Sequence, residues 1–518
     1  MTLALGYCRL RSIFATTSSF YRKTNYLEIM KRLSLIAVLL FLCMATRSIG
    51  REANYHVQVH MTDVKDSLIY LVHYYGKNRP TIFISDSMRL DSKGNATFVG
   101  NDSTFVGGIY IILIGDKERT NFEFLLNKGD NMTITATKSK LPDDIKFKNS
   151  PENDRFLDYI NYLKGYAGKQ EKLKERLKNA TTTSDTDAIR KESIADTKVL
   201  TTYRRDYIKA HPHSLLANVF SAMEVPEVPE GPHMLEDGVT KDSTFAYHYY
   251  KSHYWDGWDF KDDRLIYTPL YDAKIEEYMS KLVLPWTDSV EKEADWLLKK
   301  ANGTRDMFHY TLWWLTRDVE NSKVMGMDEV FVYLVENYYM KGDAFWLTPD
   351  ELEKYEDRAK KIAPNVIGNL APEVKLPNVL TKKEESLMAQ KGDYTLVVFY
   401  SPNCGHCQHE IPKLDSVYKE VLKAKGLKIY TVATEGDEKA ISDFIKKNNM
   451  ETWTNTYDPD HTSDYHNKYD VYSTPTIYLL DNKKIIRGKR LDHSNIGSVI
   501  EMLEKKAKAA KDKKTTAK

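Results

Sequence analysis

The chain has 518 residues, too many for a single hydrophobic core, so three domains are the natural expectation. Its 75 Lys and Arg residues balance 73 Asp and Glu residues, which leaves no basic field to favour nucleic acid or an anionic membrane surface as a partner. Only four cysteines occur: Cys8, Cys43, Cys404 and Cys407. A chain of this size with so few thiols is not stabilised by a disulfide framework.

A leader whose basic start lies well inside the chain precedes the first domain. Met30-Lys31-Arg32 is followed by the apolar stretch Leu33–Ala45 and by Ser48-Ile-Gly50, which offers small residues for cleavage. This order predicts a secretory signal peptide, because the apolar stretch is too short to span a membrane. Residues 1–29 carry no such pattern, so we expect Met30 to be the true start and cleavage to fall near Gly50.

The leader contains Cys43, which raises the question of lipid attachment. Leu42 stands before it, where a lipoprotein signal would have a small residue, so we expect no lipid anchor. We expect the mature chain to begin near Arg51, in the periplasm or cell envelope, with Cys404 and Cys407 as its only thiols.

Residues 51–145 are predicted to form an all-β sandwich. Short segments of alternating apolar and polar residues recur there, separated by turn sequences such as Ser92-Lys-Gly-Asn95. The seven expected strands are Tyr55–Met61, Ser67–Tyr75, Arg79–Met88, Asn95–Val99, Gly108–Leu113, Phe122–Leu126 and Met132–Thr137. No nucleophile–base pair stands out, so the sequence favours a docking or spacing role for this module.

Residues 146–365 are predicted to form an all-α domain, because the apolar period becomes helical. The segment Val225–Pro232 interrupts it as a rigid, proline-rich loop. Aromatic side chains gather after this loop at Tyr247, Tyr249, Tyr250, Tyr254, Trp255, Trp258 and Phe260. Such stripes indicate core packing. The alternative is a groove for an unfolded peptide or partner, since Tyr and Trp are common interface anchors.

Strands and helices alternate from residue 366 to residue 506, which predicts an α/β domain ending in an antiparallel hairpin. The expected elements are a strand over 395–400, a helix over 404–424, a strand over 427–433, a helix over 439–448, the strand-like segment 469–480, a strand over 484–489 and a helix over 495–506. The Lys-rich tail, residues 507–518, is expected to be frayed.

The stretch 395–414 carries the clearest chemical pattern. The apolar run Thr395–Tyr400 has the length of a buried strand, and a short polar turn leads from it into a helix that begins at Cys404. The dipole and free N–H groups at a helix start lower the pKa of a thiol there. We expect Cys404 to be the nucleophile and Cys407 to be the resolving thiol that closes a disulfide with it. The pattern favours a redox-active dithiol.

Three other interpretations of the cysteine pair remain open. One Cys-x-x-Cys is half of a zinc site, and His461 and His466 have a plausible spacing for the other half. An inert structural disulfide is a second interpretation, although it would close almost no loop. A peroxidatic cysteine is disfavoured, because the Pro-x-x-x-Thr/Ser-x-x-Cys arrangement that surrounds one is absent. Pro402 lies only two residues before Cys404. We expect no metal and no cofactor beyond the redox-active pair.

Several independent positions carry a family resemblance: Ala371-Pro372, Cys404, Cys407, Glu410, the helix-kinking Pro412 and Thr474-Pro475. With these residues, 367–506 resembles the thioredoxin-fold domain of the TlpA/ResA-like class of extracytoplasmic thiol–disulfide oxidoreductases. Residues 52–140 and 150–365 resemble β and helical modules of unknown function that accompany such domains in certain Gram-negative bacteria. Only the last third of the chain brings a mechanism.

The resemblance implies a cis bond at Thr474-Pro475 beside the cysteines, where backbone can pair with an extended peptide. The chain departs from the family at Asn403, since most members have Trp before the first cysteine. We expect Asn403 to cap the helix instead and to join Thr474 and Pro475 in binding substrate.

Two further side chains are expected to serve the cysteines. Glu410 lies three residues after Cys407 on one helix face, so we expect it to accept the proton of that buried thiol. A solvated glutamate with no such role is the alternative. His406 belongs to a Gly-His dipeptide that resembles the one in protein disulfide isomerases, where the histidine helps to stabilise the thiolate.

These expectations define the predicted function. The chain is expected to exchange disulfides with protein thiols and disulfides of the cell envelope, as a reductase kept reduced by a membrane electron donor. The first alternative is a disulfide isomerase or oxidase. The second is a peptide- or glycan-binding envelope protein with a vestigial redox domain.

Overall fold

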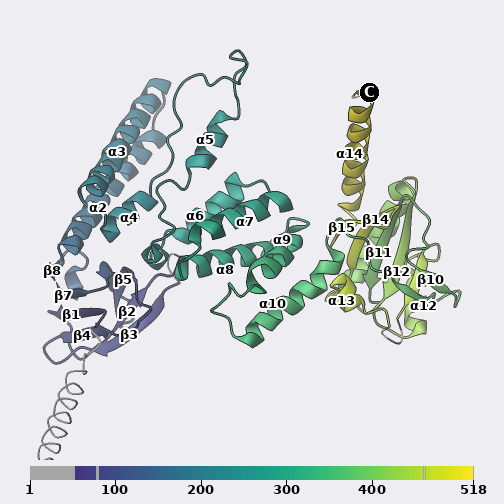
Figure 1. The fold of residues 1–518 in the computed structure, drawn as a ribbon, viewed down its shortest axis with the longest axis horizontal. Coiled ribbons are helices and arrows are strands. Elements are labelled where there is room, and N and C mark those ends of the chain that lie inside the picture. Colours follow the sequence, from purple (N-terminus) through teal and green to yellow (C-terminus); the bar gives the residue numbers. More distant parts are fainter. Residues whose placement is uncertain (1–52, 78–80, 459, 461, 517–518) are drawn as a thin grey trace, which may run out of the picture.

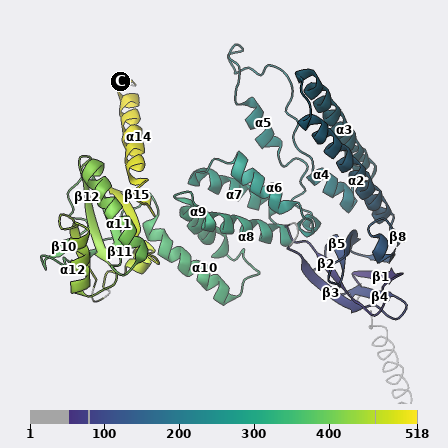
Figure 2. The same ribbon diagram turned by 180° about the vertical axis from the view of Figure 1, so that it is seen from behind.

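The computed structural model describes residues 53–77, 81–458, 460 and 462–516, and the leader predicted over residues 1–50 lies outside them. Three parts follow one another along the long axis of the molecule (Figure 1): a β sandwich, a helical part and an α/β part. The view from behind shows the same order (Figure 2). The predicted multidomain fold, β then α then α/β, is therefore confirmed.

Two four-stranded sheets form the β sandwich, with strand orders β4-β1-β7-β8 and β3-β2-β5-β6. The strands are β1 (Tyr55–Met61), β2 (Leu68–His73), β3 (Phe83–Arg89), β4 (Asn95–Gly100), β5 (Gly107–Ile114), β6 (Asn121–Asn127), β7 (Asp130–Ala136) and β8 (Ile145–Lys148). Alternation explains the packing, since Val57, Val59 and Met61 of β1 are buried against the facing sheet and the residues between them are not.

The last strand, β8, was not predicted. It pairs antiparallel with β7 and ends at Lys148, three residues beyond the expected boundary at 145. Its four residues include only two apolar ones, Ile145 and Phe147, so the sequence carries too short an alternation to reveal it.

The helical part begins with two long antiparallel helices, α2 (Pro151–Lys178) and α3 (Thr183–Ala210), that project together from the body (Figures 1 and 2). Shorter helices follow: α4 (Leu215–Ala222), α5 (Phe245–His253), α6 (Tyr271–Glu277), α7 (Thr287–Ala301), α8 (Asp306–Asn321), α9 (Met327–Leu334) and α10 (Pro349–Ile362). A capping box of Thr348 and Glu351 starts α10 by satisfying N–H groups that the first turn leaves free.

One apolar core joins the β sandwich to the helical part. The outer face of the sheet β3-β2-β5-β6 contributes Val72, Ile111 and Leu125 to the same buried cluster as the helices, so β5 is buried on both faces. The approach is close, because a Cβ added at Gly108 would lie 2.2 Å from the Cβ of Tyr267. These two parts therefore pack as one body.

Most of the aromatic stripe lies inside this core. Tyr254, Trp255, Trp258 and Phe260 are all at most 6% exposed, so the expectation of core packing is confirmed for them. Tyr247 at the start of the stripe is 38% exposed.

The α/β part contains a five-stranded sheet of order β13-β12-β11-β14-β15. Its strands are β11 (Tyr394–Tyr400), β12 (Leu427–Ala433), β13 (Thr454–Tyr457), β14 (Thr476–Asp481) and β15 (Ile486–Lys489), and its helices are α11 (Gly405–Val417), α12 (Glu438–Lys447), α13 (Tyr465–Tyr469) and α14 (Ile496–Thr516). Helices α11, α12 and α14 cover one face. Helix α13 and the hairpin β9 (Lys375–Pro377)–β10 (Glu384–Ser386) cover the other.

The expectation of a frayed tail is wrong for residues 507–516, and residues 517–518 lie outside the described part of the chain. Helix α14 continues to Thr516 and stands away from the body as a single rod (Figure 1). Lys and Ala are good helix formers, and they extend the helix without needing an apolar partner. In the described part of the chain, no helix is both long and apolar enough to cross a membrane.

Candidate active site

The cysteines follow the central strand β11, at the end of the sheet where this strand finishes. It runs parallel to β12 and antiparallel to β14, with Phe399 opposite Thr476. The turn after β11 therefore meets the residues before β14. Helix α11 begins at Gly405 with Cys404 as its N-cap, and the Cys404 N–H donates to the Ser401 carbonyl at 3.2 Å.

Cys404 is partly exposed at this helix start and is a free thiol. Its Sγ–H donates to the carbonyl of Thr474 at 3.0 Å. Burial alone would raise the pKa of Cys404, but hydrogen bonds with the Thr474 side chain and from the backbone N–H groups of Cys407 and His406 bring that pKa below its usual value. The nucleophile expected from the sequence thus has the environment of a reactive thiol.

Cys407 has the opposite environment. Its side chain is fully buried in the core between α11 and the sheet, and burial raises its pKa to about 11. It is also a free thiol, so the structure describes the reduced form of the pair. Near neutral pH, Cys407 is protonated and needs a proton acceptor before it can attack a disulfide.

Glu410 is held by a residue that the sequence did not indicate. Both the backbone N–H and the imidazole Nδ1 of His493 contact its carboxylate, at 2.5 Å from N to Oε1 and at 2.8 Å from Nδ1 to Oε2. The two side chains are 17% and 28% exposed, so the pair lies between the core and solvent. Glu410 is therefore a fixed group one turn along the helix from Cys407 and is not a freely solvated glutamate.

The loop that presents His493 starts α14. Asp492 accepts the backbone N–H and the hydroxyl of Ser494, which holds the loop in a tight turn. No periodic pattern marks such a loop, and His493 meets Glu410 across 83 positions of sequence, so only the fold reveals this contact.

The expected cap at Asn403 is wrong. The helix starts one residue later than a cap at position 403 would require, and the Asn403 side chain is exposed. Its backbone N–H donates to the Ser401 hydroxyl at 3.2 Å. The side chain nevertheless lies on the surface next to Cys404, as does that of His406. Both remain candidates for contact with a substrate.

The Thr474–Pro475 peptide bond is cis and lies beside the nucleophile. It ends the segment 470–475, which joins α13 to β14. The structure thus brings Cys404, Cys407, Thr474 and Pro475 together around the start of α11, with Glu410 one turn further along.

The zinc alternative gains no support from the described residues. His461 lies outside them, and the Nδ1 of His466 contacts the backbone carbonyl of Val471 at 2.6 Å. Among the described residues, one group of three side chains has metal-ligand spacing, and it consists of Glu410, Asp492 and His493. Neither cysteine belongs to it.

Family comparisons agree with this geometry. The AhpC/TSA family matches residues 367–489, which span the sheet and both cysteines. Residues 367–489 form a thioredoxin-like domain. The thioredoxin-like part of the resemblance expected from the sequence is confirmed for this domain, and membership of the TlpA/ResA-like class stays a prediction. A second match, to a domain of unknown function (DUF5106), covers residues 204–365 of the helical part.

Two curated relatives are similar to part of this chain. A thioredoxin-like protein of Haemophilus influenzae is 30% identical over 92 residues, which are 18% of this chain and 50% of that protein. A thioredoxin-like protein of Bacillus subtilis is 28% identical over 138 residues, 26% of this chain and 76% of that one. The chain thus spans only half the length of the first of these relatives.

Solved structures give similar matches. A domain of a possible thiol-disulfide isomerase from Cytophaga hutchinsonii is 31% identical, with 28% of this chain and 99% of that chain covered and a TM-score of 0.27. A thioredoxin-like protein from Bacteroides caccae is 20% identical, with 54% and 98% covered and a TM-score of 0.42.

Proposed function

We propose that the protein is an extracytoplasmic thiol–disulfide oxidoreductase that reduces disulfides of protein partners through Cys404 and Cys407. The observation that carries the proposal is the contrast between the two thiols. Cys404 is accessible with a lowered pKa, whereas Cys407 is buried with a pKa of about 11. One thiol is suited to attack a partner, and the other is protected until a mixed disulfide forms.

The exchange would run in two steps. The Cys404 thiolate attacks one sulfur of the partner's disulfide, and the other partner sulfur leaves as a thiolate and takes up a proton. Cys407 then gives its proton to Glu410 and attacks the Cys404 sulfur, which releases the second partner thiol. The partner gains two electrons and the protein keeps a Cys404–Cys407 disulfide.

A membrane electron donor of the thiol-reductase type would return the pair to the dithiol form. The leader over residues 30–50 supports export across the inner membrane, and with it a role in the periplasm or cell envelope. We propose no metal and no cofactor other than the disulfide itself.

Trapping tests the function directly. The Cys407→Ser variant is expected to accumulate mixed disulfides with envelope proteins, because the second attack is lost while Cys404 still reacts. Cells carrying the tagged variant are quenched with acid, and partners are identified on non-reducing gels. The Cys404→Ser variant is the matched control and should trap nothing. Equal, thiol-independent recovery of partners by both variants would instead support a binding protein with a vestigial redox domain.

The direction of exchange depends on the redox potential. Isomerase-type sites lie near about −180 mV and thioredoxin near about −270 mV, a gap of roughly 4 kcal/mol. The Gly-His dipeptide favours the isomerase or oxidase alternative. Equilibration with glutathione measures the redox potential and so distinguishes this alternative from a reductase. A potential above about −150 mV would rule out the reductase.

Glu410→Gln is expected to slow the release of the mixed disulfide by about 100-fold, because the amide accepts no proton from Cys407. Rapid-mixing kinetics with a disulfide peptide measure release, and alkylation of Cys404 in the same variant should stay unchanged. Glu420→Gln is the matched control, since Glu420 is exposed further along the same helical segment and its carboxylate accepts a hydrogen bond from the Ser416 hydroxyl. An unchanged release rate in Glu410→Gln would remove this residue from the mechanism.

A further inference from the structure

The thioredoxin-like domain meets the helical part through polar contacts. The apolar cluster shared by the first two parts ends at Ile362, and the thioredoxin-like domain builds two clusters of its own on the two faces of its sheet. A cavity of about 470 Å³ lies at the junction and is lined from both sides, by Phe331 and Arg358 and by Lys489 and Leu491. Apolar packing across the junction is therefore incomplete, and the polar contacts carry the connection.

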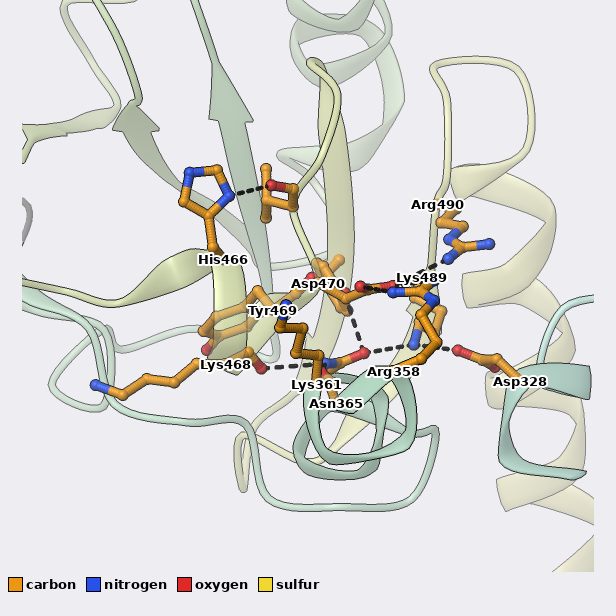
Figure 3. A network of polar contacts seen from close by, with 12 residues as sticks. Asp328, Arg358, Lys361, Asn365, His466, Lys468, Tyr469, Asp470, Lys489 and Arg490 are labelled. Carbon is orange, nitrogen blue, oxygen red and sulfur yellow. Dashed lines mark hydrogen bonds and ion pairs between the residues drawn. The ribbon is translucent and has the colours of Figure 1, made fainter. Parts of the chain in front are cut away.

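Asp470 is the centre of these contacts (Figure 3). Its side chain is 1% exposed, and its carboxylate accepts hydrogen bonds from both terminal nitrogens of the Arg358 guanidinium, which belongs to α10 of the helical part. The guanidinium of Arg490, from the thioredoxin-like domain itself, contacts the same carboxylate at 3.1 Å. A buried carboxylate is stable only with such partners, so its place is determined by both parts together.

Arg358 reaches a second residue of the same segment. Its guanidinium lies 5.5 Å from the ring centre of Tyr472, and the amine of Lys361, one turn further along α10, lies 5.8 Å from that ring. Asp470 and Tyr472 both precede Thr474, whose carbonyl accepts from Cys404. The helical part thus touches the short segment that meets the nucleophile.

Asn365, in the turn after α10, contacts helix α13, which precedes segment 470–475. Its side-chain amide donates to the carbonyl of Lys468 in α13 at 3.2 Å, and its oxygen accepts from Lys489 at 2.6 Å. Residues on both sides of Asp470 are therefore held by groups from α10 and the turn after it.

We propose that Arg358 and Asp470 form an interdomain clamp by which the helical part positions segment 470–475 for binding a polypeptide substrate. The proposal rests on the proposed function and gives the helical part a role in it. Arg358 and Asp470 are positioning residues, since neither touches a cysteine. A small disulfide needs only Cys404, whereas a polypeptide strand must also align with Thr474 and Pro475. Loss of the clamp should therefore affect the two kinds of substrate differently.

Arg358→Met in the full-length protein is the test variant. It keeps an unbranched apolar side chain and removes the guanidinium. Asp470 keeps its pair with Arg490, so the thioredoxin-like domain retains an internal partner for the buried carboxylate. Arg358→Lys restores the charge without the paired guanidinium contacts. Arg205→Met is the matched control, because Arg205 bridges Glu224 and Glu227 within the helical part.

Two measurements decide the proposal. Arg358→Met should lower the rate constant for reducing insulin about tenfold or more, with the rate for a small aromatic disulfide changed less than twofold and Arg358→Lys intermediate. Hydrogen exchange in the peptide covering 465–475 should accelerate in Arg358→Met and not in Arg205→Met. Equal losses on both substrates, or unchanged exchange, would overturn the clamp. If the wild type fails to reduce insulin, the proposed function is contradicted, and the exchange comparison alone then decides the clamp.

Discussion

Cys404 is expected to react with iodoacetamide at least about 100 times faster than Cys407 at pH 7. Only the thiolate reacts, and hydrogen bonds hold the pKa of Cys404 below its usual value, so a larger fraction of Cys404 than of an ordinary thiol is ionised at this pH. With a pKa of about 11, Cys407 is ionised to about 0.01%, and its burial hinders access further. Mass spectrometry of the reduced wild type resolves the two rates.

The pH dependence of each alkylation rate shows whether the pKa of that thiol is lowered or raised. The rate at Cys404 should reach its plateau at a lower pH than an ordinary thiol, and the rate at Cys407 should still be rising near pH 11. The same chain unfolded in urea is the control, because both thiols then titrate alike. Equal rates in the folded protein, or a titration midpoint for Cys404 no lower than in the unfolded chain, would remove the basis of the proposed mechanism.

Asp328→Asn is expected to cost about 3–5 kcal/mol of stability, because it leaves a buried ammonium without its counter-charge. The side chain of Lys489 is 2% exposed, and its amine contacts Asp328 of α9 and the oxygen of Asn365 (Figure 3). Burial lowers the pKa of Lys489 even with this partner present. Hydrogen exchange of the β14 and β15 amides measures the free energy of opening.

Two further results separate a lost charge pair from a general defect. The double variant Asp328→Asn/Lys489→Met should recover most of the stability, since removing both charges leaves no unpaired ion. Because a depressed lysine pKa makes the unfolded chain bind more protons, the stability of Asp328→Asn should rise as the pH rises toward the usual lysine pKa of 10.5. If the stability costs of the two substitutions simply added, and the stability of Asp328→Asn did not depend on pH, the loss of a buried charge pair would not explain the effect.

The sequence predicted the elements that have strong local patterns. The run Thr395–Tyr400 and the helix after it were predictable, since a continuous apolar segment and a helix start leave clear marks. Strand β13 left none, because its residues are Thr-Asn-Thr-Tyr and it is a strand only through pairing with β12. The Lys-rich end of α14 was misjudged, since polarity alone does not separate a frayed tail from an exposed helix.

The site was predictable only as far as it is local. Cys404, Cys407 and Glu410 follow from their spacing on one helix. His493 and Asp470 do not, because each owes its role to a partner brought close by the fold, from 83 positions away for His493 and from 112 for Asp470. A polar residue in a loop is usually solvated, and no sequence pattern marks Asp470 as buried.

Because the β sandwich and the helices share one apolar core, the chain cannot be cut between them without exposing apolar surface. A fragment that stops after β8 would leave the outer face of the sheet β3-β2-β5-β6 uncovered, with Val72, Ile111 and Leu125 open to water. A fragment that begins near Gly368 would uncover mainly charged groups that water can solvate. The α/β part can therefore be separated with little exposure of apolar surface, whereas the β sandwich depends on the helices to cover one of its faces.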